Sequence, residues 1–206
     1  MARAPRRAAD TTLAGTAAAA VVRALKALGS PAKAKASARF FKTGKGEYGE
    51  GDVFFGVTVP EQRRLARGFK DLPLPEIDKL LRHEVHECRL TALVVLTQRY
   101  ARANEADRAG IAAFYLSRTK RVNNWDLVDL SARDILGEHL AARPGERALL
   151  YRLARSRDLW ERRIAIIATH AFIRRGEFDD TLKLAELLLA DRHDLIHKAE
   201  IGRAHV

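Results

Sequence analysis

Hydrophobic residues recur along this chain at helical spacing rather than in the strict alternation of strands. The clearest runs begin at Leu90, Ile111 and Leu182, where apolar positions return every three or four residues. Prolines mark expected boundaries, with Pro60 and Pro144 standing where helices should begin. Helical patterning without a strand signal predicts an all-α fold.

Charged and aromatic residues also repeat along the chain. Trp125 and Trp160 lie 35 residues apart, Asp158 reads as the N-cap of the second stretch, and another helix should start at Asp194. A period of roughly 30 to 45 residues with helical patterning is typical of stacked helical pairs. We therefore expect an α-solenoid, a superhelix of HEAT-like repeats.

An earlier copy of the same order is visible near Glu84. It places His86 at the position of Trp160 and Arg89 at the position of Arg163. The copy strengthens the repeat interpretation. It also means that an arginine at this position can belong to the scaffold of a repeat rather than to a site.

One long segment, residues 43–59, interrupts the helical pattern with five glycines and the aromatics Tyr48, Phe54 and Phe55. No strand precedes it and no Gly-Lys-Ser/Thr follows it, so it lacks the context of a nucleotide-binding loop. We expect a connector whose glycines permit tight turns and whose two phenylalanines anchor it against the helices.

Size and composition indicate one domain. The chain has 206 residues, 47% of them hydrophobic, which is enough for a substantial core. We assign residues 11–199 to this domain and residues 1–10 to a basic N-terminal tail that we expect to be disordered.

The net charge of +11 is concentrated near the N-terminus. Residues 1–42 carry a net charge of +8, whereas residues 43–206 carry +3. Such a segment attracts polyanions and favours nucleic acid as a partner, although a solvated tail would have the same composition.

A single cysteine, Cys88, within an apolar run argues against a disulfide framework and fits a reducing compartment. No segment of the sequence has the length and hydrophobicity of a membrane span or the character of a signal sequence. We expect a cytoplasmic, monomeric protein without a membrane partner.

The candidate chemistry lies at residues 123–129. Asn123 reads as an N-cap, which explains Asp126 as an acid in the first turn. Trp125 and Asp129 are four residues apart and share a helical face. Asp129 lies past the first turn among apolar residues, where a carboxylate must reach solvent or serve a function.

A second group of candidates is basic or aromatic. Trp160 and Arg163 share a helical face, and Arg162, Lys120 and Arg121 are further candidates for phosphate contacts. Core packing is the alternative for either tryptophan, and simple solvation is the alternative for the three additional cations.

Histidines suggest a metal site only superficially. The pattern from His193 to His197 resembles a zinc-binding His-Glu-x-x-His, but Asp194 is a methylene shorter than the expected base and no third ligand follows. We expect a polar helix start there and no metal. His83 and His86 are expected at the surface or in a groove.

These residues together resemble the AlkD-like family of DNA alkylation repair proteins, which are HEAT-like helical DNA glycosylases. The resemblance covers residues 37–199, and its most specific parts are residues 46–52, residues 55–60, Trp125 with Asp129, and residues 160–163. In that family the matching tryptophan and aspartate lie in the DNA-binding cleft, with the matching arginine beside them.

The resemblance implies hydrolysis of the N-glycosidic bond of cationic purines such as N3-methyladenine and N7-methylguanine in double-stranded DNA, leaving an abasic site without a cofactor. Asp129 would stabilise the oxocarbenium-like sugar and position a water, Trp125 would offer a π-face, and Arg163 would contact a phosphate. A carboxylate about 4 Å from a unit positive charge contributes on the order of 4 kcal/mol at an effective dielectric near 20, roughly a thousandfold in rate.

The sequence departs from the family pattern after Ala199. The family continues with a small residue, a glycine, a cleft tryptophan and further helices, whereas this chain reads EIGRAHV at residues 200–206. One choice of codons for these seven residues spells a common sequencing adapter. We therefore expect residues 200–206 to be non-native and the family domain to be truncated at its C-terminus.

Two non-enzymatic functions remain open. A helical-repeat module could bind damaged DNA without cleaving it, although Asp129 facing a polyanion would then be a cost without a benefit. A protein-interaction scaffold is a common use of such repeats, and it predicts no selective DNA binding and no response to Asp129→Asn.

Overall fold

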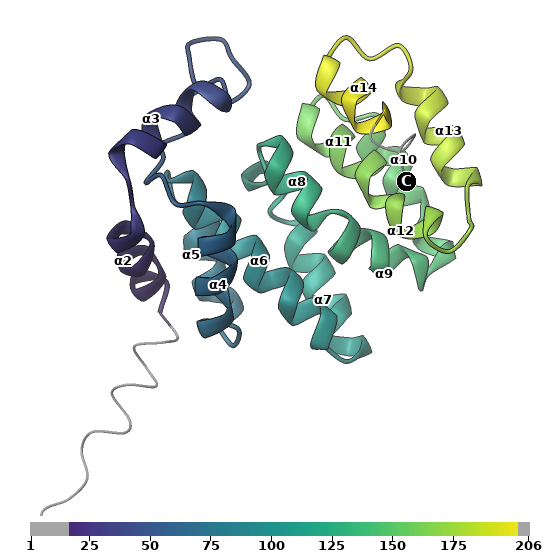
Figure 1. Cartoon of the computed structure of the whole chain (residues 1–206). Helices are drawn as coiled ribbons and strands as arrows, with labels where there is room; N and C mark the ends of the chain where they lie inside the picture. The colour runs from purple at the N-terminus through teal and green to yellow at the C-terminus, as the bar shows by residue number, and fades with distance from the viewer. Residues whose placement is uncertain (1–16, 202–206) are drawn as a thin grey trace, which may run out of the picture. The chain divides into compact units, whose positions relative to one another are not determined.

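A computed structural model describes residues 17–201, and these residues form two compact units, residues 17–99 and residues 100–201. Within the described residues every regular element is a helix, and the one β-bridge pairs Val53 with Val85. The all-α class is therefore confirmed (Figure 1). The expected basic tail at residues 1–10 lies outside the described residues, and the assignment of residues 11–199 to one domain stays a prediction.

Unit 1 contains helices that are buried to different degrees. Its described helices are α2 (Ala18–Leu28), α3 (Pro31–Phe40), α4 (Val59–Gly68), α5 (Leu74–Leu81) and most of α6 (His86–Arg102). Helix α2 packs against α4 and α5, and the backbone N–H of Ala18 donates to Glu76 Oε2 at 2.8 Å. The apolar run from Leu90 lies in α6, as predicted.

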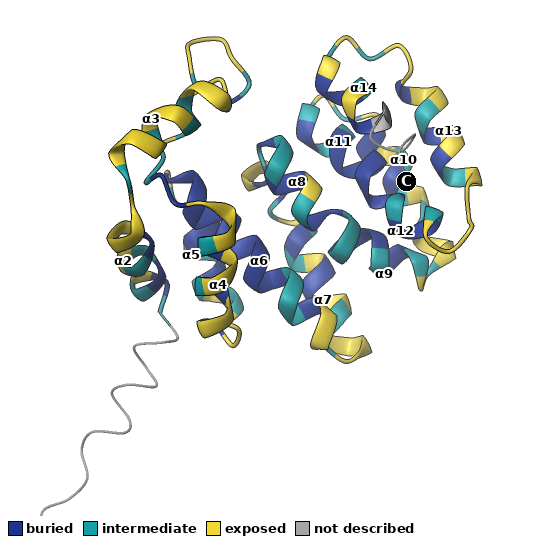
Figure 2. Ribbon diagram, viewed as in Figure 1, coloured by how far each residue is buried: buried dark blue, intermediate teal, exposed yellow. Residues whose placement is uncertain are grey.

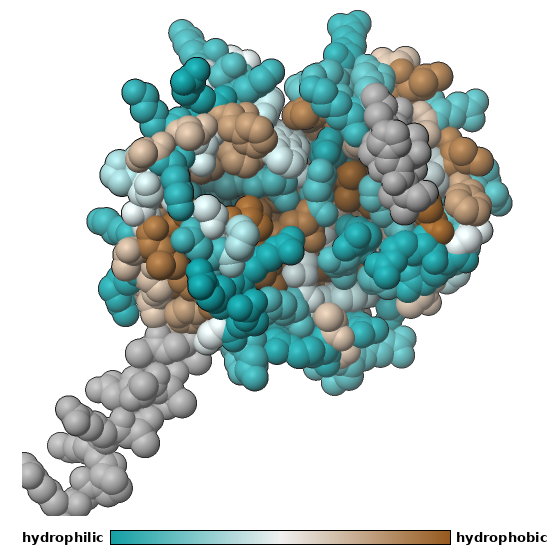
Figure 3. Space-filling view, in the orientation of Figure 1, coloured by the Kyte–Doolittle hydropathy of each residue, from teal (hydrophilic) through white to brown (hydrophobic). Residues whose placement is uncertain are grey.

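Helix α3 differs from its neighbours because none of its residues is buried (Figure 2). Lys33, Lys35 and Arg39 of α3 are exposed. Hydrophilic side chains project from the part of the surface where α3 lies (Figure 3). Gly56 allows the helix to approach the following loop, since its φ is +81° and an added Cβ would lie 2.2 Å from the Ser30 carbonyl oxygen. Contact between backbones therefore holds α3 in place where apolar burial does not.

Unit 2 contains the remaining helices. They are α7 (Glu105–Leu116), η1 (Thr119–Arg121), α8 (Trp125–Ser131), the π-helical η2 (Arg133–Gly137), α9 (Glu138–Ala141), η3 (Pro144–Glu146), α10 (Ala148–Ala154), α11 (Leu159–Ala168), α12 (His170–Ile173), α13 (Asp179–Leu188) and α14 (Asp194–Ile201). The runs from Ile111 and Leu182 fall in α7 and α13, and α14 begins at Asp194, as predicted. Residues 202–206 lie outside the described part.

Helix α11 is the centre of unit 2. It packs against α8, α10, α13 and α14, and most of its residues from Trp160 to Ala168 are buried (Figure 2). Asp158 caps it, accepting hydrogen bonds from the backbone N–H groups of Trp160 at 2.8 Å and Glu161 at 3.4 Å, which confirms the predicted N-cap. Gly137 permits a close approach, since an added Cβ would lie 2.3 Å from the Ala168 carbonyl oxygen.

Candidate functional site

Helix α8 presents the two residues of the predicted site. Asn124 caps it, its Oδ1 accepting from the Trp125 N–H at 2.8 Å, so the predicted cap at Asn123 is wrong by one residue. Asp126 lies in the first turn as expected, with its Oδ1 accepting from the Leu127 N–H at 2.8 Å. Trp125 opens the helix and Asp129 follows one turn later, so they lie on adjacent turns of one face.

Asp129 is held by a two-point ion pair with Arg163 of α11. Arg163 Nε donates to Asp129 Oδ1 at 2.9 Å and Nη2 donates to Oδ2 at 2.8 Å. Arg163 Nη1 donates to the Leu195 carbonyl oxygen of α14. A guanidinium bound in this way by both oxygens fixes the plane of the carboxylate as well as its position.

The two partners differ in exposure. The Arg163 side chain is 6% exposed, whereas the Asp129 side chain is 37% exposed. The pKa of Asp129 is nevertheless raised above its ordinary value, first because surrounding groups displace its hydration and also because of the Asp126 charge, while Arg163 opposes the shift. Asp129 is thus an accessible carboxylate whose charge is incompletely solvated.

Arg163 makes hydrogen bonds within unit 2 through its guanidinium. Each nitrogen of its buried guanidinium donates to Asp129 or to Leu195. The guanidinium therefore lies against Asp129, and its contact with a phosphate stays a prediction. What the structure brings together is a carboxylate and the arginine that orients it.

Trp160 and Arg162 both lie in the first turn of α11, and their contacts with DNA stay predictions. Trp160 is 9% exposed and belongs to the core, the alternative that the sequence left open. Arg162 Nε and Nη2 donate to the Asp191 carboxylate at 2.5 and 3.3 Å, and Nη1 donates to the carbonyl oxygens of Ser156 and Arg157. Arg162 therefore fastens the segment before α14, a contact for which the sequence offered no signal.

Lys120 and Arg121 lie in η1, just before α8. The Lys120 side chain is 68% exposed, and its Nζ lies 2.8 Å from Asp158 Oδ2 and 3.5 Å from Glu161 Oε1. Hydrogen bonding to Asp158 raises the pKa of Lys120, so this side chain stays an ammonium. Arg121 is exposed as well. Both cations are accessible to an anionic ligand.

Unit 1 contains a related arrangement that the sequence signalled only in part. Arg89, aligned with Arg163 by the repeat, donates from Nη2 to Asp52 Oδ1 at 2.5 Å. His86 Nδ1 lies 3.0 Å from Asp52 Oδ2, and the His86 ring stacks on Phe54. His86 is 2% exposed, so its expected place at the surface or in a groove is wrong, because the ring completes a buried polar cluster.

The glycine-rich segment is anchored chiefly by a carboxylate. Buried Glu87 accepts hydrogen bonds from the backbone N–H groups of Phe55, Gly56 and Val57 at 3.1, 2.7 and 3.2 Å. Phe54 stacks on Phe41, so one of the two predicted aromatic anchors is also present. The sequence did not identify Glu87, because nothing in a helical run shows that a carboxylate faces three free amides.

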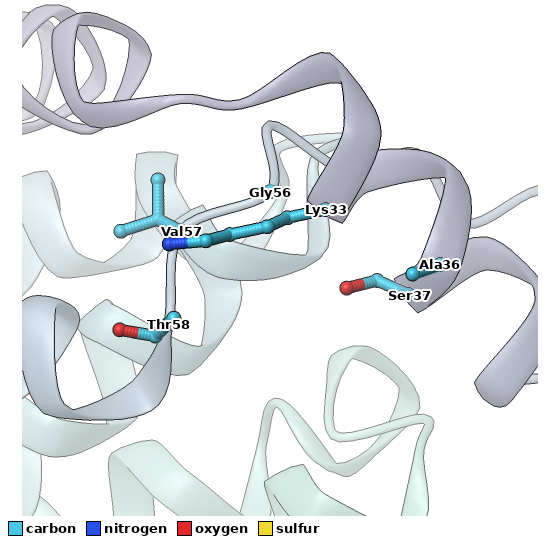
Figure 4. Close-up of a pocket in the computed structure, with 6 residues that line it drawn as sticks. All are labelled: Lys33, Ala36, Ser37, Gly56, Val57 and Thr58. Carbon is cyan, nitrogen blue, oxygen red and sulfur yellow. The ribbon is translucent and has the colours of Figure 1, made fainter.

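Two open recesses lie away from Asp129. The first, about 240 Å³ in volume, lies in unit 1, where Figure 4 shows the Lys33 side chain extending from α3 towards Val57 and Thr58. The second, about 380 Å³, lies in unit 2 beside Tyr151 and Leu187. None of the candidate residues from the sequence lines either of these two recesses.

The histidines near α14 make local contacts. His193 Nδ1 lies 3.5 Å from Asp194 Oδ1, and His197 Nε2 lies 2.7 Å from the Asp191 carbonyl oxygen. Over residues 17–201, no three side chains of His, Cys, Asp or Glu are grouped so that they could hold a metal ion. In the same range no helix is long and apolar enough to cross a membrane.

Two of three comparisons with known proteins found a match. A family model described as DNA alkylation repair enzyme matches residues 21–203. Among solved structures, the chain is similar to a predicted DNA alkylation repair enzyme from Enterococcus faecalis, with 19% identity and a TM-score of 0.63, covering 83% of this chain and 79% of that chain. A search of curated proteins found no match. At this identity the structural likeness supports the fold alone.

Proposed function

The chain belongs to the DNA alkylation repair enzyme family, and on that premise we propose that it is a monofunctional DNA glycosylase. Its substrates are cationic alkylated purines in duplex DNA, such as N3-methyladenine and N7-methylguanine, and its product is an abasic site. We include in the proposal that it acts as a monomer in the cytoplasm, on the DNA found there.

One observation carries the proposal: Asp129 is an accessible, incompletely solvated carboxylate oriented by a buried arginine. In this pair the arginine side chain is 6% exposed while the carboxylate side chain stays 37% exposed. A carboxylate that must approach a developing positive charge needs such exposure. The raised pKa of Asp129 supports the same interpretation. Burial destabilises the ionised carboxylate, and a cation beside it would stabilise that ionised form.

The proposed reaction follows from these contacts. The bond between the sugar carbon and the purine nitrogen breaks, and its electron pair neutralises the cationic base. Asp129 stabilises the positive charge on the sugar, a water oxygen bonds to the sugar carbon, and the proton of that water passes to Asp129 or to solvent. Arg163 keeps the carboxylate ionised and fixed in direction, so little reorganisation is required.

Two neighbours of Asp129 complete the proposed site. Trp125 begins α8 one turn before it and would offer a π-face to the cationic base or sugar. Lys120 and Arg121 would contact phosphates as exposed cations. The raised pKa of Lys120 argues against a neutral amine that attacks the sugar, which supports hydrolysis without strand cleavage.

The test is base release from duplex DNA that carries N7-methylguanine, measured for the chain and for Asp129→Asn at enzyme concentrations that saturate the DNA. We expect release by the chain, and its loss in the variant without loss of DNA binding. Lesion binding without release by either protein would assign a damage-binding module. Absence of selective binding would assign a scaffold and overturn the proposal.

A further inference from the structure

The segment that carries Trp125 and Asp129 is attached to α11 at both of its ends. At the far end Arg163 holds Asp129. At the near end Glu161 Oε1 accepts a hydrogen bond from the Thr119 hydroxyl at 2.9 Å. Glu161 and Arg163 are two residues apart in the first two turns of α11, whereas Thr119 and Asp129 are ten residues apart.

Glu161 is well placed to hold this end firmly. Its side chain is 17% exposed, and its other oxygen, Oε2, accepts from the Ser156 hydroxyl at 2.5 Å. Burial raises its pKa, but the hydrogen bonds from Ser156 and Thr119 outweigh this and leave the pKa below its ordinary value. Glu161 is therefore an ionised acceptor at neutral pH, and charge-assisted hydrogen bonds of this kind are stronger than neutral ones.

The chain between the two attachment points has little freedom. Thr119 is 6% exposed, and Val122 and Asn124 are fully buried. Asn124 also caps α8, so its position sets where Trp125 begins the helix. A shift of η1 away from α11 would therefore be transmitted to Trp125 and to the start of the helix that bears Asp129.

From this geometry we infer that the Thr119–Glu161 hydrogen bond is a positioning device for the proposed reaction, setting Trp125 and Asp129 against α11. Glu161 and Thr119 are positioning residues, because neither lies where it would touch the reacting atoms. The inference rests on the proposed function for its kinetic part. Its structural part, the placement of Trp125, can be measured without activity.

The placement is tested by fluorine NMR on protein labelled with 5-fluorotryptophan, since the sequence has two tryptophans. Trp125→Phe assigns the two resonances. We expect Glu161→Ala and Thr119→Val to shift and broaden the Trp125 resonance alike, and the double variant to add nothing. Glu161→Gln and Thr119→Ser, which keep an acceptor and a hydroxyl, should restore it.

The kinetic part is tested by single-turnover release of N7-methylguanine. Displacement of reacting groups is costly to catalysis, so we expect a loss of roughly tenfold in Glu161→Ala and in Thr119→Val, without a further loss in the double variant. The conservative variants should recover the rate. Thr97→Val, which removes a hydroxyl bonded to the Val94 carbonyl oxygen in α6, is the matched control and should change neither readout.

An unchanged Trp125 resonance in folded Glu161→Ala would overturn the inference, and so would losses that simply add in the double variant. A shifted resonance with an unchanged release rate would overturn the kinetic part. Absence of release by the unaltered chain would instead refute the proposed glycosylase, and the resonance would then decide the placement alone.

Discussion

The two units contain the same ion pair in opposite settings. Arg89 and Arg163 are almost equally buried, with side chains 7% and 6% exposed. Their aspartates differ, since the Asp52 side chain is 5% exposed and the Asp129 side chain is 37% exposed. The repeat thus places a buried arginine in each unit. The exposure of the paired aspartate distinguishes the scaffold contact at Asp52 from the candidate site at Asp129.

The two aspartates differ in exposure because they come from different kinds of segment. In unit 1 the aspartate comes from the glycine-rich segment, and Phe41, Phe54 and the His86 ring pack around the cluster. In unit 2 the aspartate comes from the exposed side of a short helix. A buried pair contributes to a unique fold at a desolvation cost, whereas an open one keeps its charge available to a ligand.

The distinction between the two ion pairs is tested most strongly by comparing base release in Asp129→Asn and in Asp52→Asn. Loss of the carboxylate charge should lower the rate of base release roughly a thousandfold. This corresponds to about 4 kcal/mol, the interaction of a carboxylate with a unit positive charge about 4 Å away. Asp52→Asn should leave release per folded molecule within a few-fold of the unaltered chain. Single-turnover rates normalised to folded protein by circular dichroism make this measurement. Equal losses in both variants would contradict a functional distinction between the pairs.

Stability should show the reverse order. Removing the charge of Asp52 leaves Arg89 buried without an anion, and breaking a buried pair costs about 3–5 kcal/mol of unfolding free energy. Asp129→Asn should cost clearly less, because solvent reaches the site and the native carboxylate is incompletely solvated. Urea denaturation of both variants measures the difference. A larger loss for Asp129→Asn would remove the basis of the comparison.

The pH dependence of release should respond to Arg163. Because burial raises the pKa of Asp129, release should be full at high pH and fall with decreasing pH at a value above the usual 3.9 for aspartate. Arg163 opposes this shift, so Arg163→Gln should move the acidic limb to higher pH. Arg89→Gln serves as the control, and its acidic limb should not move. A limb that stays fixed in Arg163→Gln would assign the titration to another group.

The smallest effect is expected for the exposed cations beside the open pair. Arg121→Ala should weaken duplex binding a few-fold and reduce the slope of log affinity against log salt concentration by about 0.9, the value for one phosphate contact. Arg82→Ala in unit 1, whose Nε lies 2.9 Å from Asp78, is the matched control. Fluorescence anisotropy over a series of salt concentrations gives both slopes. Identical slopes for the two variants would remove Arg121 from the interface.

The sequence predicted the helical class, the separation of Trp125 and Asp129 by one turn, and the equivalence of Arg89 and Arg163. These features depend on local periodicity, which one sequence displays directly. The partner of each arginine was not predicted, although Asp52 and Asp129 precede their arginines by 37 and 34 residues. The similar separations were a signal, but Asp52 lies in an irregular segment where no period applies.

The burial of individual side chains could not be predicted from the sequence either. Arg163 was expected at a phosphate and Trp160 was left between site and core, and both proved to be buried. Glu161, Glu87 and Asp191 were missed because each accepts hydrogen bonds from a distant segment. The environment of such a carboxylate depends on tertiary packing, and local propensity carries no information about it.

The hydrogen bond from Arg163 to the Leu195 carbonyl oxygen has a consequence for folding. The pair at Asp129 requires contacts across 34 residues towards α8 and 32 residues towards α14, whereas contacts within a helix span only three or four. Contacts between distant segments carry a larger loop-closure cost and tend to form late. A chain with all its helices formed but α14 undocked would keep the pair between Arg163 and Asp129 and would lose the Leu195 acceptor that holds the third guanidinium nitrogen.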